Sequence, residues 1–303
     1  MLGLLIVLAI QQVKPVDRAI DRGIAYLSVE VPRWRIGHEC RSCHHQGDGA
    51  RALFVAKGAG LRVDDQAIAD VKIWLMDSQA WEKNGADGPF NDKRVARLQF
   101  SSALASGVVA KSVVANEAMR TVADQLVKDQ ADDGSWPVAE VNVLGTPVTR
   151  GKPLATALAI KTLMAADTLR YSASIERAKL WVIANKITST LDAAVAIRVQ
   201  VNNPRALAFL IEGQSEEGGW GPYVTSAPEV FDTAGVLWAL ERTPHTHEIK
   251  RMVAKSREYL IRSQLEDGSW PETTRPSGSE SLAQRVSTTA WALIALITTR
   301  TID

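Results

Sequence analysis

Three copies of the pattern Gln-x3-Gly-x-Trp constrain the fold of this chain more than any other feature. They span residues 130–136, 214–220 and 264–270. The second and third copies also follow similar text, Arg205-Ala-x2-Phe209-Leu210 and Lys255-Ser-x2-Tyr259-Leu260. Self-similarity of this kind indicates a chain built from repeated structural units.

The upstream half of the pattern recurs without its Gly-x-Trp tail. It is found at Arg22-Gly-x2-Tyr26, Trp74-Leu75-x3-Gln79 and Arg177-Ala-x2-Trp181, and a degenerate copy surrounds Gln125. Six units follow from these landmarks. Their approximate ranges are 16–60, 63–110, 116–168, 172–201, 203–243 and 247–300.

Each unit has the pattern of two helices. The landmark residue lies late in a first helix of mixed polarity, and a turn rich in Gly, Asp and Pro follows. A second helix then begins, rich in alanine and apolar on nearly all sides, as in the segment 288–296. No extended run of alternating apolar and polar residues is present. We therefore predict an all-α fold, an α6/α6 toroid: a closed barrel of six outer–inner helix pairs in one domain, residues 14–303.

The Gln and Trp of each complete pattern are predicted to be structural. They would tie the end of an outer helix to the turn that follows it. This assigns a structural role to three of the nine tryptophans. The residues concerned are Gln130, Trp136, Gln214, Trp220, Gln264 and Trp270.

These repeats resemble the QW motifs of squalene–hopene cyclases and related triterpene cyclases. The six-pair architecture is similar to the toroid shared by these terpenoid cyclases and the β subunits of protein prenyltransferases. The resemblance extends over roughly residues 16–300 and is strongest over 116–137 and 203–296. It implies an isoprenoid or similarly apolar ligand.

The resemblance also implies where a cyclase acid would stand. Cyclases of this kind protonate their substrate with a segment Asp-x-Asp-Asp-Thr-Ala, and the matching segment here runs from Glu229 to Ala234. Asp232 fits the pattern and Glu229 replaces the first acid, but Phe231 stands where the proton donor is expected. Such cyclases normally have a second helical domain as well, for which 303 residues leave no room. The prenyltransferase zinc site requires an Asp-x-Cys spelling that this chain lacks.

Cys40-x-x-Cys43-His44 contains both cysteines of the chain and has the spelling that attaches c-type haem. In the repeat register it precedes the first inner helix, at the predicted mouth of the toroid. Covalent haem would use Cys40 and Cys43 for thioethers and His44 as an axial ligand. A zinc site of Cys40, Cys43, His44 and His45 is the first alternative. A Cys40–Cys43 disulfide or two unmodified thiols are the others.

Other features bear on location and partners. Residues 1–13 contain an uncharged apolar run that suits a secretory signal and is too short to span a bilayer; a first helix packed on the domain is the alternative. We expect an exported, periplasmic or extracytoplasmic protein. Lys and Arg (35) nearly balance Asp and Glu (34), which gives no support for nucleic-acid binding.

The sequence thus predicts a terpene-cyclase-like toroid that lacks the cyclase acid and carries a cofactor at its mouth. With haem or a metal it would be an oxidoreductase or electron carrier with a redox partner. A binding protein that holds an isoprenoid without catalysis is the second hypothesis. A divergent cyclase that acts through Asp232 is the third.

Overall fold

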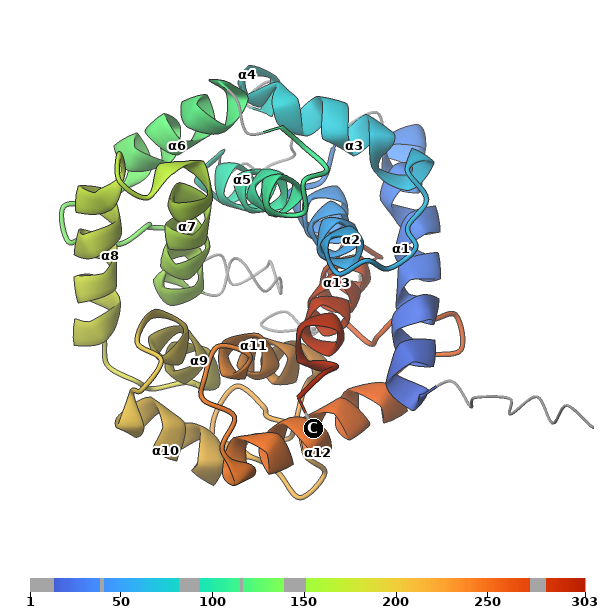
Figure 1. The fold of residues 1–303 in the computed structure, drawn as a ribbon, viewed down its shortest axis with the longest axis vertical. Helices are drawn as coiled ribbons and strands as arrows, with labels where there is room; N and C mark the ends of the chain where they lie inside the picture. Colours follow the sequence, from blue (N-terminus) through green and yellow to red (C-terminus); the bar gives the residue numbers. More distant parts are fainter. Residues whose placement is uncertain are drawn as a thin grey trace, which may run out of the picture.

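The computed structural model describes residues 14–38, 41–81, 93–114, 117–138, 151–272 and 282–302. Within these ranges the helices form two concentric rings (Figure 1). The inner ring consists of α2 (Asp48–Gly58), α5 (Lys93–Val109), α7 (Lys152–Asp167), α9 (Thr190–Val199), α11 (Val230–Leu240) and α13 (Leu282–Thr299). The outer ring consists of α1 (Pro15–His38), α3 (Gln66–Met76) with α4 (Ser78–Trp81), α6 (Glu117–Asp129), α8 (Ser172–Ala184), α10 (Pro204–Gly213) and α12 (His247–Arg262).

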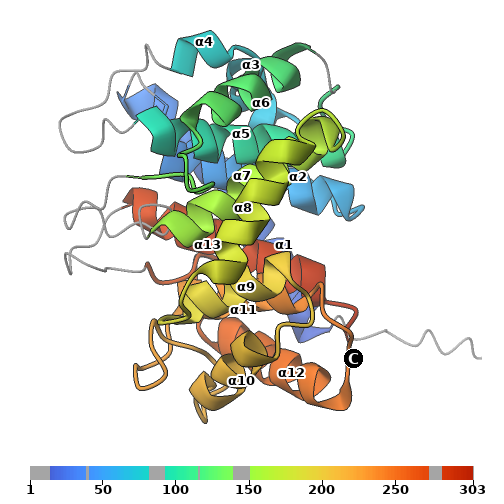
Figure 2. The ribbon, with the colours of Figure 1, turned by 90° about the vertical axis from the view of Figure 1, so that its left-hand side faces the viewer.

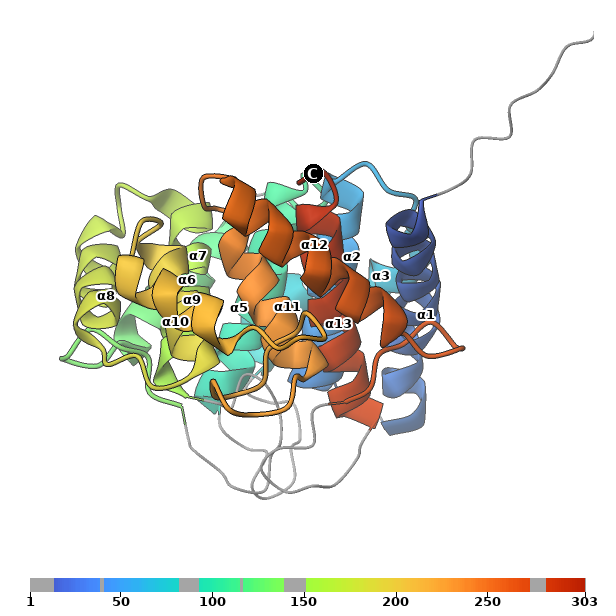
Figure 3. The same ribbon diagram turned by 90° about the horizontal axis from the view of Figure 1, so that it is seen from below.

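Outer and inner helices alternate along the chain, and each outer helix packs on one or two neighbouring inner helices, as α8 does on α7 and α9. Seen from the side, α8 lies in front of α7 (Figure 2). Seen from below, the inner helices α11 and α13 lie side by side (Figure 3). In the described part of the chain the only extended pairing is an isolated bridge between Trp220 and Glu229. The predicted all-α toroid is confirmed.

The two rings differ in composition because they differ in burial. Every residue of α11 is buried, which suits a helix that is apolar all round. By contrast, α12 buries one face, including Met252 and Leu260, and exposes Lys and Arg on the other. The hydrophobic core therefore lies between the rings and among the inner helices.

Each complete repeat pattern joins one outer helix to the next. The indole Nε1 of Trp220 donates to the Leu210 carbonyl at 2.7 Å, which satisfies a carbonyl at the end of α10. The Gln214 amide donates to Met252 O of α12 at 3.1 Å and to Gly218 O at 3.0 Å. Patterns 130–136 and 264–270 make equivalent bonds.

The last copy of the pattern closes the ring. Gln264, which follows α12, donates to the carbonyl of Ala19 in α1 at 2.9 Å. The two residues lie 245 positions apart in sequence. The first and last outer helices are therefore joined by the same bond that joins consecutive ones.

The second repeat contains a shortened version of the pattern that sequence reasoning missed. Trp81 is buried and its Nε1 donates to Trp74 O at 3.0 Å. Only seven residues separate donor and acceptor here, whereas ten separate them in the complete copies. Because the spacing differs, the Gln-x3-Gly-x-Trp template does not detect it.

No helix in the described residues is both long enough and apolar enough to cross a membrane.

Candidate functional site

A buried carboxyl group lies where three inner helices meet. Asp48 begins α2, and its Oδ2 accepts from the Ser287 hydroxyl of α13 at 2.6 Å and from the Gln99 amide of α5 at 3.2 Å. Burial raises the pKa of Asp48 to about 6, and the Arg51 charge and the two hydrogen bonds oppose that rise. Asp48 is therefore an acid that can change its protonation state near neutral pH.

One turn further along α2, Arg51 is also buried, with 1% of its side chain exposed. Its Nη1 lies 3.6 Å from Asp48 Oδ1, and its guanidinium stacks on the Trp291 ring with Cζ 4.1 Å from the ring centroid. None of its three guanidinium nitrogens has a hydrogen-bond partner among the described residues. Burial lowers the pKa of Arg51 to about 10.

Two tryptophans extend this stack across the interior. Trp291 of α13 and Trp238 of α11 pack edge to face, with ring centroids 5.7 Å apart. Arg198 of α9 lies over the other ring, its Cζ 4.5 Å from the Trp238 centroid. Arg198 also pairs with Glu241 at 2.7 Å. A continuous row, Arg51–Trp291–Trp238–Arg198, thus joins α2 to α9 through α13 and α11.

Lys161 of α7 supplies a third positive group. Its Nζ donates to the Ser106 hydroxyl of α5 at 3.4 Å. The pKa of Lys161 is lowered to about 7, mainly by burial and also by the charges of Arg51 and Arg198, while Glu241 opposes the shift.

The α5 helix faces this cluster with a polar stripe. Gln99, Ser102 and Ser106 recur at helical spacing and all three are buried. Gln99 contacts Asp48 and Ser106 contacts Lys161, so Ser102 lies between the two contacts. The Ser102 hydroxyl has no hydrogen-bond partner among the residues that the structure describes.

The predicted acid segment divides between two environments. Phe231 packs edge to face on Trp291 at 5.4 Å, on the same side of α11 as Trp238. Thr233 accepts from the backbone N–H of Trp220 at 2.9 Å, so it serves the repeat pattern. Asp232 is buried and Glu229 is half-buried.

Asp232 and Glu229 are both close enough to the outer ring to affect Tyr259 of α12. Burial raises the pKa of the Tyr259 phenol, and nearby carboxylates, Glu229 and Asp232 among them, add to the rise. The structure therefore brings Asp232 and Glu229 near Tyr259. Phe231, by contrast, contacts the interior ring of Trp291.

The predicted cofactor motif lies between α1 and α2. Cys43 begins a short π-helix, η1 (Cys43–Gly47), and its partly buried side chain packs on the core. His45 is buried, and its Nε2 donates to the Glu30 carbonyl of α1 at 2.8 Å, so that nitrogen already has a structural role. Cys40 and the side chain of His44 lie outside the described residues. Within the described part, no group of three or more His, Cys, Asp or Glu residues is placed to hold a metal.

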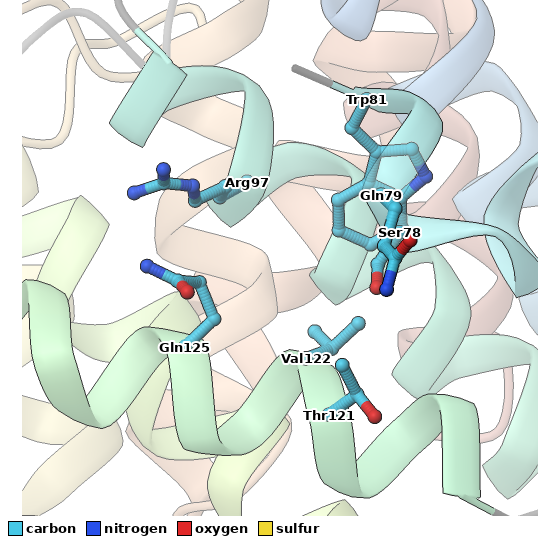
Figure 4. Close-up of a pocket in the computed structure, with 7 residues that line it drawn as sticks. All are labelled: Ser78, Gln79, Trp81, Arg97, Thr121, Val122 and Gln125. Carbon is cyan, nitrogen blue, oxygen red and sulfur yellow. The ribbon is translucent and has the colours of Figure 1, made fainter. Parts of the chain in front are cut away.

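A cavity of about 290 Å³ is lined by residues that include Trp81, Val122 and Gln125 (Figure 4). It is bordered by α4, α5 and α6 and contains Arg97, which pairs with Asp129 at 2.6 Å. This ion pair balances the charge of Arg97, and Arg285 similarly pairs with Glu272 at 2.9 Å.

Comparison with known proteins agrees with this architecture. Residues 198–303 match the family model of the squalene-hopene cyclase C-terminal domain. The type II terpene cyclase MstE from Scytonema has 13% identity and a TM-score of 0.59, over 96% of this chain and 100% of that one. A variant of MstE in complex with merosterolic acid A, its product, has 13% identity and a TM-score of 0.59, over 95% of this chain and 98% of that one. A protein from Actinoplanes has 16% identity and a TM-score of 0.59, over 94% of this chain and 100% of that one.

The chain is an α/α toroid, and its last third is similar to the squalene-hopene cyclase C-terminal domain. It shares this fold with MstE over 96% of its length. Because the entire MstE chain is covered, a toroid of this size without a second helical domain occurs in a type II terpene cyclase.

Proposed function

We propose that this protein binds an isoprenoid chain against the aromatic interior of the toroid and does not protonate it from the fifth repeat. The observation that carries the proposal is the packing of Phe231, Trp238 and Trp291 into one aromatic cluster between α11 and α13. The three rings are at most 3% exposed, so a ligand would have to open this packing to reach them. Aromatic faces and edges suit the methyl groups and double bonds of an isoprenoid. Phe231 has no proton to give at the place where the resemblance expects the donor.

The solved complexes of relatives support this ligand class. Variants of MstE were solved with geranylgeranyl dihydroxybenzoate, the substrate, and with merosterolic acid A, the product. Those compounds are ligands of that enzyme. For this chain, they indicate which chemistry to test first: a C20 isoprenoid.

The test is equilibrium binding of geranylgeraniol, a neutral C20 isoprenoid, to the full chain. Trp291→Leu is expected to weaken binding at least about fivefold, because it removes the central ring of the cluster. Trp181→Leu is the matched control on the outer helix α8 and is expected to leave binding unchanged. Absence of saturable binding to the wild-type chain would refute the proposal.

A divergent cyclase is the second candidate, and Asp48 favours it. A carboxyl group with a pKa of about 6, buried beside the aromatic row, can be protonated when a ligand excludes water. The acid would be Asp48, or Asp232 as the sequence suggests. Incubation with C20 and C30 isoprenoids, followed by mass spectrometry, tests this candidate. Loss of a cyclised product in Asp48→Asn but not in Asp232→Asn would assign the acid, and the absence of any product would end the hypothesis.

A cofactor at Cys40, Cys43 and His44 and export of the chain remain separate proposals. The partly buried Cys43 at the start of η1 is the described residue on which the cofactor depends. Covalent haem predicts a Soret band, retained after denaturation, in protein made with c-haem maturation, and its loss in Cys43→Ala. A colourless protein with stoichiometric zinc would favour the metal alternative. A reporter enzyme active only outside the cytoplasm, fused after residue 13, tests export.

A further inference from the structure

We infer that the cavity between α4, α5 and α6 is a binding site for a small neutral aromatic molecule, such as an indole. Its lining combines the Trp81 side chain with amide and hydroxyl groups. It lies at a junction between outer helices where the repeat pattern is shortened, and where the aromatic side chain found at the complete junctions is missing from α6. None of its lining residues belongs to the aromatic cluster of the interior, so the inference does not rest on the proposed function.

At a complete junction, an aromatic side chain late in the following outer helix packs on the repeat pattern. Tyr259 of α12 lies against the copy at 214–220, because a Cβ on Gly219 would be 3.0 Å from its Cδ1. Trp181 of α8 is hydrogen-bonded to Asp133 within the copy at 130–136. Each ring thus covers the turn that joins its own helix to the preceding one.

Tyr26 of α1 has the same relation to the last copy of the pattern. Burial raises the pKa of its phenol to about 12, and the charges of Glu30 and of Asp267, a residue of that copy, add to the rise. At the α4–α6 junction the corresponding residue is Gln125, and α6 contains no aromatic residue. Gln125 and Gln79, the glutamine of the shortened pattern, both line the cavity. The cavity is therefore found where a ring would be expected from the other junctions.

The polar groups of the lining favour a neutral ligand. Figure 4 shows Arg97 and Gln125 on one side of the cavity and Gln79 and Trp81 on the other. Arg97 pairs with Asp129 at 2.6 Å, and the Gln125 amide donates to the same carboxylate at 3.4 Å. An anion would have to compete with Asp129 for Arg97. A neutral ring with a polar edge needs no counter-charge, and it can form hydrogen bonds with the two amides.

The size of the cavity fits one or two fused rings. An apolar cavity of about 150 Å³ holds benzene, and pockets for drug-sized ligands begin at about 300 Å³. The volume here is about 290 Å³, which lies between these values. Indole has two fused rings and one N–H donor, and its bound ring would take the place of the aromatic side chain that α6 does not supply.

The test is a ligand-observed NMR titration of the full chain with indole. Wild type is expected to bind indole saturably. Gln125→Trp should weaken this binding at least about tenfold, because the new ring fills the cavity. Arg120→Trp is the matched control: it adds the same ring to an exposed position of α6 that does not line the cavity, and it should bind indole as wild type does.

A second variant keeps the inference testable if Gln125→Trp fails to fold. Thr121→Phe narrows the same cavity from an exposed position of α6 and should also weaken the binding of indole. No saturable binding to wild type, or equal binding by wild type and a folded Gln125→Trp, would overturn the inference. Binding that is lost in Trp291→Leu and kept in Gln125→Trp would assign indole to the interior and overturn it as well. Tighter binding of indole-3-carboxylate than of indole would contradict a site for neutral ligands.

Discussion

At the scale of single residues, the interior of this toroid contains ionisable side chains that are shielded from water. Burial moves the pKa of Asp48 upward and the pKa values of Arg51 and Lys161 downward, as desolvation requires for an acid and two bases. Each shift records a cost of holding the charged form inside the fold. Proteins retain such groups chiefly at functional sites, and Asp48 is the one that the divergent-cyclase candidate uses.

Lys161 gives a pH-dependent prediction. Its pKa is about 7 in the folded chain and 10.5 as the ordinary lysine value, so between these pH values the unfolded chain holds a proton that the folded chain has lost. The stability of the folded state should therefore rise with pH over this range. Lys161→Met removes the buried amine, and it should be about 2–4 kcal/mol more stable than wild type at pH 7 and nearly equal to it at pH 10.

Urea unfolding at several pH values, with Lys179→Met as control, measures this difference. The control residue pairs with Glu176 on an outer helix and should show no pH-dependent gap. A gap between wild type and Lys161→Met that stays constant from pH 7 to 10 would show that Lys161 titrates normally in the folded chain.

Sequence reasoning could not find this cluster, for a physical reason. Three different helices carry Arg51, Lys161 and Arg198. In a sequence, a single charged residue on a helix is normally interpreted as exposed to solvent. Only closure of the ring brings them together. Phe231 was found because a recognisable segment surrounds it, yet its packing on Trp291 depends on the position of α13.

At the scale of elements, the repeat pattern works as a clamp between successive outer helices. The glycine of the pattern allows the close approach. Gly218 has a φ of +97°, and a Cβ placed there would lie 2.5 Å from the carbonyl oxygen of Lys255 in α12. Gly134 and Gly268 have the same geometry against Arg177 and Arg22. This explains why the pattern requires glycine, which the sequence showed without giving the cause.

Substitution of Gly218 tests the clamp. Gly218→Ala should lower the free energy of unfolding by more than about 3 kcal/mol, because the methyl group meets backbone atoms that cannot move aside. Gly60→Ala is the matched control: its φ is +75°, but nothing lies within 4 Å of the added Cβ. It should cost about 1 kcal/mol, from backbone strain alone.

Denaturant unfolding of the two variants, with circular dichroism at 222 nm, measures both losses. Equal destabilisation would mean that strain accounts for both, and that the contact of Gly218 with α12 contributes nothing.

At the scale of the whole molecule, the fold was predictable because the pattern of one outer and one inner helix recurs in six units of the sequence. Three features of the sequence predicted the same closed arrangement: helix periodicity, apolar inner segments and the recurring Gln-x3-Gly-x-Trp pattern. In the structure, the hydrogen bond from Gln264 to the Ala19 carbonyl closes the ring. The function was not predictable in the same way. A toroid presents six inner helices to its interior, and a site made of single residues from several of them leaves no continuous motif.

Photolabelling is the sharpest test of whether an isoprenoid binds inside the inner ring. A diazirine-bearing geranylgeraniol would be crosslinked to the full chain, and the labelled peptides mapped by mass spectrometry. If the isoprenoid binds there, labels are expected on peptides that carry Trp238 and Trp291, and excess unlabelled geranylgeraniol should suppress them. Labels confined to the outer cavity of Trp81, Thr121 and Gln125, or spread over exposed helices, would contradict it.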